Sequence, residues 1–382
     1  MAKKAYVGVN NVARKVSKMY VGVGGIARKV KKAYVGVGGV ARLFFQKGMD
    51  FNKIQITTRV PLDETASATN SNYVLIGGGE TRTQSSTSTQ PNLTVDAFDN
   101  NLTRTACTDL SGMRSLRGGS SENYAMLASL NSNINIYNNS LSKQTISTTL
   151  DQNGTPGGDT LNHCVFETTN LSTQTSLCCI DKSTLSKTNT TGLEIPTGLT
   201  TDPSSCSRFK NSWYCFGWGS IYVRSYNENL TRQANVSHAS HTSAAGRMGV
   251  GTTLNYLICA GGQSSSINYA SVFAMDENNT ITSISSLNVA ASNFSGCGND
   301  EYCMFSNGSS GNSGNVSITT NNYVYAYSDN LTKSLKYASN MGAWTYGSIN
   351  FKDRLFLPNG RVYSNPSTGS GNYDTGVIDV WS

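Results

Sequence analysis

Short apolar runs alternate with polar turns along most of this chain. The clearest example begins with a strand at Tyr73–Ile76, followed by a glycine break and a second strand at Leu93–Phe98. A polar turn at Asp99–Asn101 then leads into a third strand that opens at Leu102. Short strands bounded by turn residues are typical of an antiparallel meander.

The same meander recurs down the chain, which indicates a repeat architecture. Its first strand returns six times, at Tyr124–Leu127, His163–Phe166, Tyr214–Phe216, Tyr256–Cys259, Tyr302–Phe305 and Arg354–Leu357. The polar turn returns only five times, at Asn138–Leu141, Asp181–Leu185, Asn227–Leu230, Asp276–Asn279 and Asp329–Thr332. There are therefore seven copies of the strand and six of the turn.

The missing turn is explained by the two ends of the repeat region. The chain ends on Gly376–Trp381, a strand of the second type with no third strand after it. Ile54–Val60 precedes the first copy, where a strand of the third type belongs. If these two segments pair, the repeats close into a ring without open sheet edges. The sequence therefore predicts an all-β fold, with residues 49–382 forming a seven-bladed β-propeller closed by an N-terminal strand.

The repeat resembles the kelch type of propeller. In that family one strand ends in Gly-Gly, and a later strand carries an aromatic-Asp pair followed by Trp. Gly77–Gly78 and Gly261–Gly262 match the glycine pair, and Phe98–Asp99 matches the aromatic-Asp pair. The Trp position differs, because it holds leucine in this chain, at Leu102, Leu141, Leu185, Leu230 and Leu331. The resemblance implies the fold and brings no functional residue with it.

A second and shorter repeat occupies the start of the chain. Residues 5–16 return at 19–30 and 33–44, with two-residue turns at Asn10–Asn11, Gly24–Gly25 and Gly38–Gly39. Such turns between β-forming residues predict hairpins in which Val9 faces Val12 and Val7 faces Arg14. A β-meander with a turn every seven residues is the simplest interpretation, and a trimeric β-spiral is the alternative. The segment buries little apolar surface alone, so we expect a homo-oligomer, with a trimer favoured.

This N-terminal segment is strongly basic. Residues 1–48 contain eleven Lys and Arg and no Asp or Glu, so the rest of the chain is net negative although the whole carries +7. A basic arm can bind an acidic protein, an anionic surface or nucleic acid. Alternatively, its charges are solvated edge residues that keep a small sheet from aggregating. Candidate attachment residues recur once per repeat, at Tyr6, Arg14, Tyr20, Arg28, Tyr34 and Arg42.

The tandem pattern AYVGVGG(V/I)ARKVKK resembles short repeats at the front of phage and prophage structural proteins of Gram-positive gut bacteria. The resemblance implies a virion component that attaches to other virion proteins through residues 1–48. The start MAKKAYVGV lacks the apolar core of a signal peptide, so we expect synthesis in a bacterial cytoplasm and no membrane insertion.

The nine cysteines are predicted to be buried filler. Cys164, Cys215 and Cys303 fall at the same place in three copies of the first strand, where other copies have apolar residues. The odd count and the missing secretory signal argue against a disulfide framework. Neighbours such as Cys178 and Cys179 point to opposite faces of a strand, so they should not share a metal. Cys297 and Cys303 remain a candidate pair across a hairpin.

The sequence shows no catalytic motif, and we expect neither an enzyme nor a metal or cofactor site. His163 occupies a strand position usually held by Tyr, while His238 and His241 fall on opposite faces of a strand. The repeated Asp99, Asp181, Asp276 and Asp329 stand in turns, where a carboxylate accepts backbone hydrogen bonds.

The longest connections remain as candidate binding surface. Residues 80–91, 262–268 and 307–321 all follow the first strand of a repeat, so they should cluster on one face of the ring. They consist of polar residues with occasional aromatics, which suits recognition of glycans or proteins, although simple solvation is the alternative. The binding residues predicted here are Gln84, Tyr269, Asn307, Asn321 and Tyr323.

Three functions are compatible with these features. The first is a phage tail fibre or baseplate protein whose arm attaches to the particle and whose propeller binds host-surface polysaccharide or protein. The second is a capsid or tail decoration protein with a purely structural role. The third is an enzyme acting on cell-wall glycans, which two carboxylates converging at the ring centre would favour.

If the basic arm drives assembly, deletion of residues 1–48 should leave a folded, monomeric propeller. Light scattering measures this directly. An oligomer that persists after the deletion would place the assembly contacts in the propeller instead.

Overall fold

The computed structural model divides the chain into two compact units, Met1–Phe51 and Asn52–Ser382. All described elements are β-strands, and no helix in the described part of the chain is long and apolar enough to cross a membrane. The structure describes residues 6–9, 12–15, 19–23, 26–30, 32–37, 40–46, 51–62, 65–81, 90–111, 113–130, 133–148, 157–170, 174–194, 203–217, 222–240, 248–264, 267–292, 294–306, 323–337, 347–358, 361–365 and 370–382.

The first unit consists of three hairpins. They are β1 (Tyr6–Val9) with β2 (Val12–Lys15), β3 (Met19–Val23) with β4 (Ile26–Val30), and β5 (Lys32–Val37) with β6 (Val40–Gln46). The pairing of Val9 with Val12 and of Val7 with Arg14 is confirmed.

The predicted continuous meander is wrong, because the described strands of this unit form three separate two-stranded sheets. The sequence gives a reason for this. Asn and Gly pairs fill the turn positions within each hairpin, whereas Ser17–Lys18 and Lys31 stand between hairpins. Ser and Lys do not favour the positive φ angles that a two-residue turn requires.

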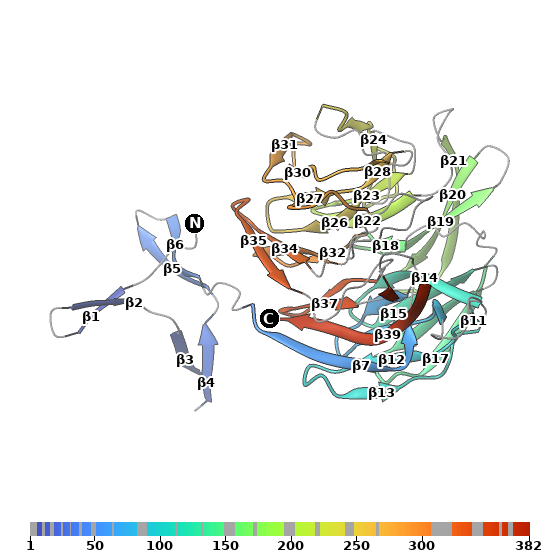
Figure 1. The fold of residues 1–382 in the computed structure, drawn as a ribbon, viewed down its shortest axis with the longest axis horizontal. Coiled ribbons are helices and arrows are strands. Elements are labelled where there is room, and N and C mark those ends of the chain that lie inside the picture. Colours follow the sequence, from blue (N-terminus) through green and yellow to red (C-terminus); the bar gives the residue numbers. More distant parts are fainter. Residues whose placement is uncertain are drawn as a thin grey trace. The chain divides into compact units, whose positions relative to one another are not determined.

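The second unit is a ring of seven β-sheets, so the predicted seven-bladed propeller is confirmed (Figure 1). From the ring axis outward, blade 1 consists of β8 (Ala66–Thr69), β9 (Val74–Gly77), β12 (Val95–Phe98) and β13 (Arg104–Ala106). Blade 2 consists of β14 (Met113–Ser120), β15 (Tyr124–Leu130), β16 (Asn133–Asn138) and β17 (Lys143–Ser147). Blade 3 consists of β18 (Gly157–Asp159), β19 (His163–Asn170), β20 (Gln174–Asp181) and β21 (Lys187–Glu194).

Blades 4 to 6 repeat the same order. They are β22 (Pro203–Phe209), β23 (Ser212–Gly217), β24 (Tyr222–Asn227) and β25 (Val236–Ser237); β26 (Gly249–Thr252), β27 (Leu257–Ala260), β30 (Val272–Met275) and β31 (Ile281–Ile284); and β32 (Ser295–Gly298), β33 (Tyr302–Ser306), β34 (Tyr323–Ser328) and β35 (Lys333–Tyr337). Two small hairpins extend the connections of blades 1 and 5, namely β10 (Glu80–Thr81) with β11 (Gln90–Pro91) and β28 (Gln263–Ser264) with β29 (Ile267–Asn268).

Blade 7 is built from both ends of this unit, as the sequence predicts. Its strands β36 (Ile349–Phe351), β37 (Arg354–Pro358) and β39 (Ser370–Trp381) are followed in the sheet by β7 (Lys53–Leu62), and β38 (Arg361–Asn365) also pairs with β39. Figure 1 shows β7 running alongside β39. The register places Ile56 opposite Ile378 and Ile54 opposite Val380. The closing pairing thus joins segments more than 300 residues apart in sequence.

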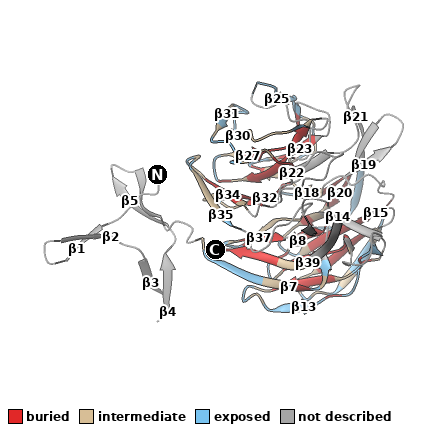
Figure 2. Cartoon of the chain, in the orientation of Figure 1, coloured by how far each residue is buried: buried red, intermediate tan, exposed pale blue. Residues whose placement is uncertain are grey.

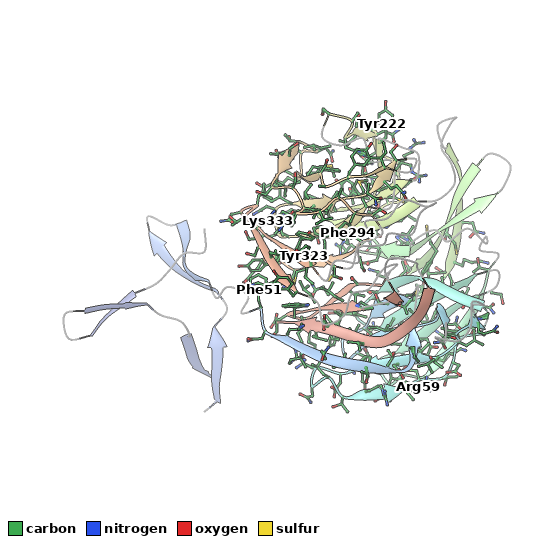
Figure 3. The ribbon with its side chains drawn as sticks, viewed as in Figure 1. Phe51, Arg59, Tyr222, Phe294, Tyr323 and Lys333 are labelled. Carbon is green, nitrogen blue, oxygen red and sulfur yellow. The ribbon has the colours of Figure 1, made fainter. Side chains whose placement is uncertain are left out.

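The closing strand is also tied to blade 1 through an ion pair at Arg59, which Figure 3 labels. The Arg59 Nε donates to Asp96 Oδ1 at 2.7 Å, and its backbone N–H donates to Oδ2 at 2.6 Å. Its Nη2 also donates to the Val95 carbonyl at 2.9 Å. Since the Asp96 side chain is only 2% exposed, these donors replace the water that this carboxylate loses on folding.

The hydrophobic core lies between neighbouring blades. Phe209 and Phe216 of blade 4, for example, pack in one cluster with Phe273 of blade 5. The cluster between blades 7 and 1 contains Val74 and Val380. In Figure 2 the middle strands carry the buried residues, whereas outer strands such as β13 and β31 are largely exposed. Each blade is therefore stabilised by its neighbours as well as by its own hydrogen bonds.

The six polar turns share one backbone device. In five of them an Asp or Asn side chain accepts two hydrogen bonds from backbone N–H groups later in the turn. Asp99, for example, accepts from Asn101 and Thr103, two and four residues later. Three other turns have the same spacing, and in the Asp181 turn the donors stand two and three residues later. In the sixth turn Ser328 takes this role by accepting from Thr332. The predicted Asp329 lies one residue later and instead accepts hydrogen bonds from the Asn255 backbone and side chain in blade 5.

The leucine that replaces the kelch Trp has a structural explanation. Leu102, Leu141, Leu185, Leu230 and Leu331 all adopt φ between 59° and 64°. This left-handed conformation costs roughly 1–2 kcal/mol for a residue with a Cβ atom. Each of the five side chains packs against a core cluster between blades, which offsets that cost.

The sequence prediction missed the innermost strand of every blade. These strands converge on the ring axis, where some positions leave no room for a side chain. A Cβ atom added at Gly118 would sit 1.7 Å from the Ser67 carbonyl oxygen, and one at Gly298 would sit 1.8 Å from that of Thr252. The inner strands therefore consist largely of Gly, Ser, Ala and Thr, and they lack the apolar pattern that identifies the middle strands.

The prediction that the cysteines are buried is largely confirmed. All nine are thiols, and eight of them are buried. The proposed approach of Cys297 and Cys303 is wrong, because Cys297 lies opposite Met304 while Cys303 lies opposite Gly298. This offset by one residue sends the two side chains to opposite faces of the blade. Burial raises the pKa of the Cys179 thiol to about 12.

Removing the carboxylate at position 96 should weaken ring closure. Asp96→Asn leaves Arg59 with only the exposed Asp109 carboxylate as an ionised acceptor, so we expect the free energy of unfolding to fall by about 2–3 kcal/mol. Asp109→Asn is the matched control, because that carboxylate lies 3.4 Å from the same guanidinium and is 55% exposed. Urea unfolding followed by tryptophan fluorescence measures both. Equal effects of the two substitutions would refute a special role for Asp96.

The buried thiols also predict loss of stability at alkaline pH. Unfolded Cys179 would lose its proton near its ordinary pKa, whereas the folded thiol keeps it up to about pH 12. The native state therefore binds more protons between pH 9 and 12, and the free energy of unfolding should fall by about 1.4 kcal/mol per pH unit for this thiol. Cys179→Ala should flatten the pH dependence by that amount. An unchanged slope would contradict the assignment.

Candidate functional site

A channel runs along the axis of the ring between the innermost strands of all seven blades. Its volume is about 380 Å³, and glycine, serine and threonine dominate its wall. Among its described lining residues only Asp159 of β18 and Arg208 of β22 carry a charge. The two carboxylates that would favour a glycan-cleaving enzyme are therefore not found in the described wall of the channel.

The channel opens into a wider polar cleft, which we call the channel mouth. It has a volume of about 560 Å³ and is formed by Thr69, Ser120, Ser121, Glu122, Asn123, Asp159, Leu161, Asn162, Asp181, Lys182, Ser183 and Arg208. Some of these residues come from the inner strands β8, β14, β18 and β22 of blades 1 to 4. The others stand at the β14–β15, β18–β19 and β20–β21 turns. Four of them, Thr69, Ser120, Asp159 and Arg208, also line the channel.

One side of the channel mouth is fixed by Lys182 in the β20–β21 turn. Its Nζ donates to Asp159 Oδ2 at 3.0 Å and to the Thr160 carbonyl at 2.6 Å. Its backbone N–H donates to the Asn162 carbonyl at 2.9 Å. The Lys182 side chain is 14% exposed and that of Asp159 is 29% exposed, so water screens this ion pair only in part.

The other side is fixed by Arg208 of β22 and by Glu228 of the β24–β25 turn. The Arg208 Nη2 lies 3.5 Å from Glu228 Oε1, while Glu228 Oε2 accepts a hydrogen bond from the Leu161 backbone. The buried Nε of Arg208 has no hydrogen-bond partner among the described residues. A ligand oxygen at the channel mouth would satisfy this buried donor after a shift of the Arg208 side chain.

The neighbouring Asp181 belongs to the turn and is not available as a proton acceptor. Hydrogen bonds from the Ser183 hydroxyl, from the Thr184 and Ser183 backbone and from the Thr184 hydroxyl hold the pKa of its carboxyl well below the ordinary range. It therefore stays ionised at neutral pH and stabilises the turn, as the sequence predicts for the repeated aspartates.

The described residues offer no site for a metal. No group of three or more His, Cys, Asp and Glu side chains in that part of the chain is arranged to hold an ion. His163 starts β19 and is half-buried, while His238 is fully buried beside Phe216 and Phe273. His241 lies outside the described residues.

Of the predicted binding residues, Tyr269 and Tyr323 are described, and they lie at the β27–β30 and β33–β34 connections, on the opposite face of the ring from the channel mouth. Tyr269 is half-buried against the cluster between blades 4 and 5, and its backbone bonds to Gly262 and Ala291. Tyr323, which Figure 3 labels, packs against the cluster between blades 5 and 6. Its ring contacts those of Tyr325 and Tyr337. The two tyrosines thus flank blade 5 rather than meeting. Gln84, Asn307 and Asn321 lie outside the described residues.

The predicted attachment residues all lie on strands of the hairpins. Tyr6 and Arg14 occupy β1 and β2, Tyr20 and Arg28 face Lys29 and Val21 in the second hairpin, and Tyr34 and Arg42 face Leu43 and Val35 in the third. Tyr and Arg therefore recur at matching register positions in the three hairpins. Whether they attach to a particle stays a prediction.

Sequence reasoning missed the channel mouth because the charged residues that fix it come from separate inner strands and turns. Asp159 and Arg208 stand on inner strands that the apolar pattern does not reveal. Lys182 and Glu228 stand in turns where charged residues are ordinary. A signal was nonetheless present, since Lys182 and Glu228 each follow the capping residue of a repeated turn, and turns of one type meet on one face of a propeller.

Comparison with known proteins supports the fold and no more. No protein-family model matches the chain, and no curated protein is similar to it in sequence. A streptogramin B lyase structure aligns with a TM-score of 0.58 at 9% identity, over 87% of this chain and 97% of that one. Virginiamycin B lyase from Staphylococcus aureus aligns with a TM-score of 0.54 at 9% identity, over 87% and 99%. At such identity the likeness concerns the propeller fold, and the lyase activity is that of those proteins.

Proposed function

We propose that this chain is a bacteriophage virion protein whose basic arm attaches to other virion proteins and whose propeller binds polysaccharide on the host surface. Two features of the arm favour an attachment role. Its hairpins occur in tandem, and residues 1–48 contain eleven basic residues and no acidic residue. The resemblance of these repeats to phage and prophage structural proteins supports the virion assignment.

The observation that carries the binding role is the polar channel mouth. Its lining carries both signs of charge, with Lys182 and Arg208 against Glu122, Asp159 and Asp181, and Lys182 is paired with Asp159, so the cleft is polar without strong excess charge. The Arg208 Nε offers an unused donor, and the Leu161 side chain is 58% exposed beside it. Carbohydrates present hydroxyl groups together with apolar C–H faces, and a cleft that offers both kinds of contact suits them.

Binding is favoured over catalysis for a chemical reason. Glycan hydrolysis requires two carboxylic groups on opposite sides of the scissile bond. Three carboxylates line the described part of the channel mouth: Asp159 is paired with Lys182, Asp181 is held in its turn by four hydrogen bonds, and Glu122 alone does not supply the second group that hydrolysis requires. The lyase names of the two structures with this fold do not identify acid and base groups in this chain.

The test uses the full chain and wall polysaccharide extracted from Gram-positive gut bacteria, with binding followed by biolayer interferometry. We expect saturable binding that weakens at least tenfold, or about 1.4 kcal/mol, in Arg208→Gln and in Leu161→Ser. Tyr269→Phe and Tyr323→Phe are the matched controls, because they remove only a hydroxyl group on the opposite face and should leave binding unchanged.

Two outcomes would overturn parts of this proposal. If a folded wild-type protein binds none of the polysaccharides, the propeller has a decoration role on the particle instead. If the two tyrosine variants weaken binding while the channel-mouth variants do not, the ligand sits on the loop face predicted from the sequence.

A further inference from the structure

Two of the nine cysteines face each other across the inner pair of strands in blade 4. Cys206 stands on β22 and Cys215 on β23, and the strand register places them directly opposite one another. We propose that Cys206 and Cys215 form a reversible disulfide, which makes this pair an oxidative modification site in the wall of the channel.

The geometry brings the two sulfur atoms together. Residues directly opposite in an antiparallel pair point to the same face of the sheet. The two Sγ atoms lie 2.8 Å apart, so bond formation at ~2.05 Å requires a movement of less than about 1 Å. Both side chains belong to the cluster between blades 3 and 4, where Cys215 is buried and Cys206 packs against it from the channel side.

Access distinguishes this pair from the other cysteines. Cys206 is half-buried and lines the channel, whereas the other eight are buried, including Cys297, which also lines the channel but is only 6% exposed. Burial raises the pKa of Cys164, Cys259, Cys297 and Cys303, so these thiols stay protonated and unreactive at neutral pH. A small oxidant in the channel would therefore reach Cys206 first.

The reaction with a small disulfide such as oxidised glutathione is balanced. The Cys206 thiolate attacks one glutathione sulfur, the glutathione S–S bond breaks, and one glutathione thiolate leaves. The Cys215 thiolate then attacks the mixed disulfide at the Cys206 sulfur and releases the second glutathione thiolate. The protons of the two cysteines pass to the two released thiolates, so the protein loses two electrons and two protons and the oxidant gains them.

The bond would join β22 to β23 two residues before Arg208, which lines both the channel and its mouth. It would close a short loop that contains the β22–β23 turn, which restricts the unfolded chain at that point. This inference does not depend on the proposed polysaccharide binding, because it rests only on the positions of the two thiols.

The test is thiol counting on the folded full-length protein. The protein is incubated with oxidised glutathione, and remaining thiols are alkylated with N-ethylmaleimide after denaturation. Intact mass should show two fewer labels than the nine of the reduced protein. Trypsin cuts after Arg208 and Lys210, between the two cysteines, so the bond should appear as two peptides joined by a disulfide.

Matched variants identify the pair. Cys206→Ser should keep every remaining thiol open to labelling, whereas Cys297→Ser should still lose two labels on oxidation. The wild-type measurement decides the question even if a variant fails to fold. An unchanged label count, a bond between other cysteines, or glutathione that stays attached to Cys206 would each overturn the proposal.

Discussion

The pairing of β7 with β39 is the constraint on which the rest of the structure depends. It joins the start of the propeller to its end and completes the seventh sheet, so the apolar cluster between blades 7 and 1 is closed on both sides. Arg59 on β7 reaches across to the buried Asp96 of blade 1, which couples blade 7 to blade 1. An open arc would expose that cluster and two sheet edges to water. The closed ring also fixes the inner strands around a common axis, and this produces the channel and its mouth.

Much of this fold could be predicted from the sequence, because the middle strands bury both faces between blades. Tyr302–Phe305 and its equivalents are apolar runs for that reason, and the repeated turns with Asp99 or Asn138 mark the strand that follows. The orphan strands at the two ends predicted the closure. The inner strands could not be found in the same way, since the crowded axis selects small residues such as Gly118 and Gly298, whose pattern is that of a loop.

The candidate site was much less accessible to sequence reasoning. Its channel mouth combines Asp159, Lys182 and Arg208, and Arg208 is paired with Glu228; these residues lie on two blades and come together only once the ring has formed. The Cys206–Cys215 pair shows the same limitation, because their facing depends on the register of a hairpin whose first strand carries no apolar pattern. The sequence instead suggested Cys297 and Cys303, which a shift of one residue places on opposite faces. Both functional proposals therefore rest on the arrangement of inner strands and turns around the axis.

Amide hydrogen exchange of β7 tests the closed ring most directly. In a closed propeller the β7 amides that bond to β39 should exchange as slowly as those of β39 itself, because both open only when the ring opens. The β7 peptide covering residues 53–62 should be compared with the outer strand β13 of blade 1, which stays in its sheet whether or not the ring is closed. The predicted result is that the amides of β7 exchange slowly, as those of β13 do. Fast exchange in β7 alone would show that the N-terminal strand does not close the ring.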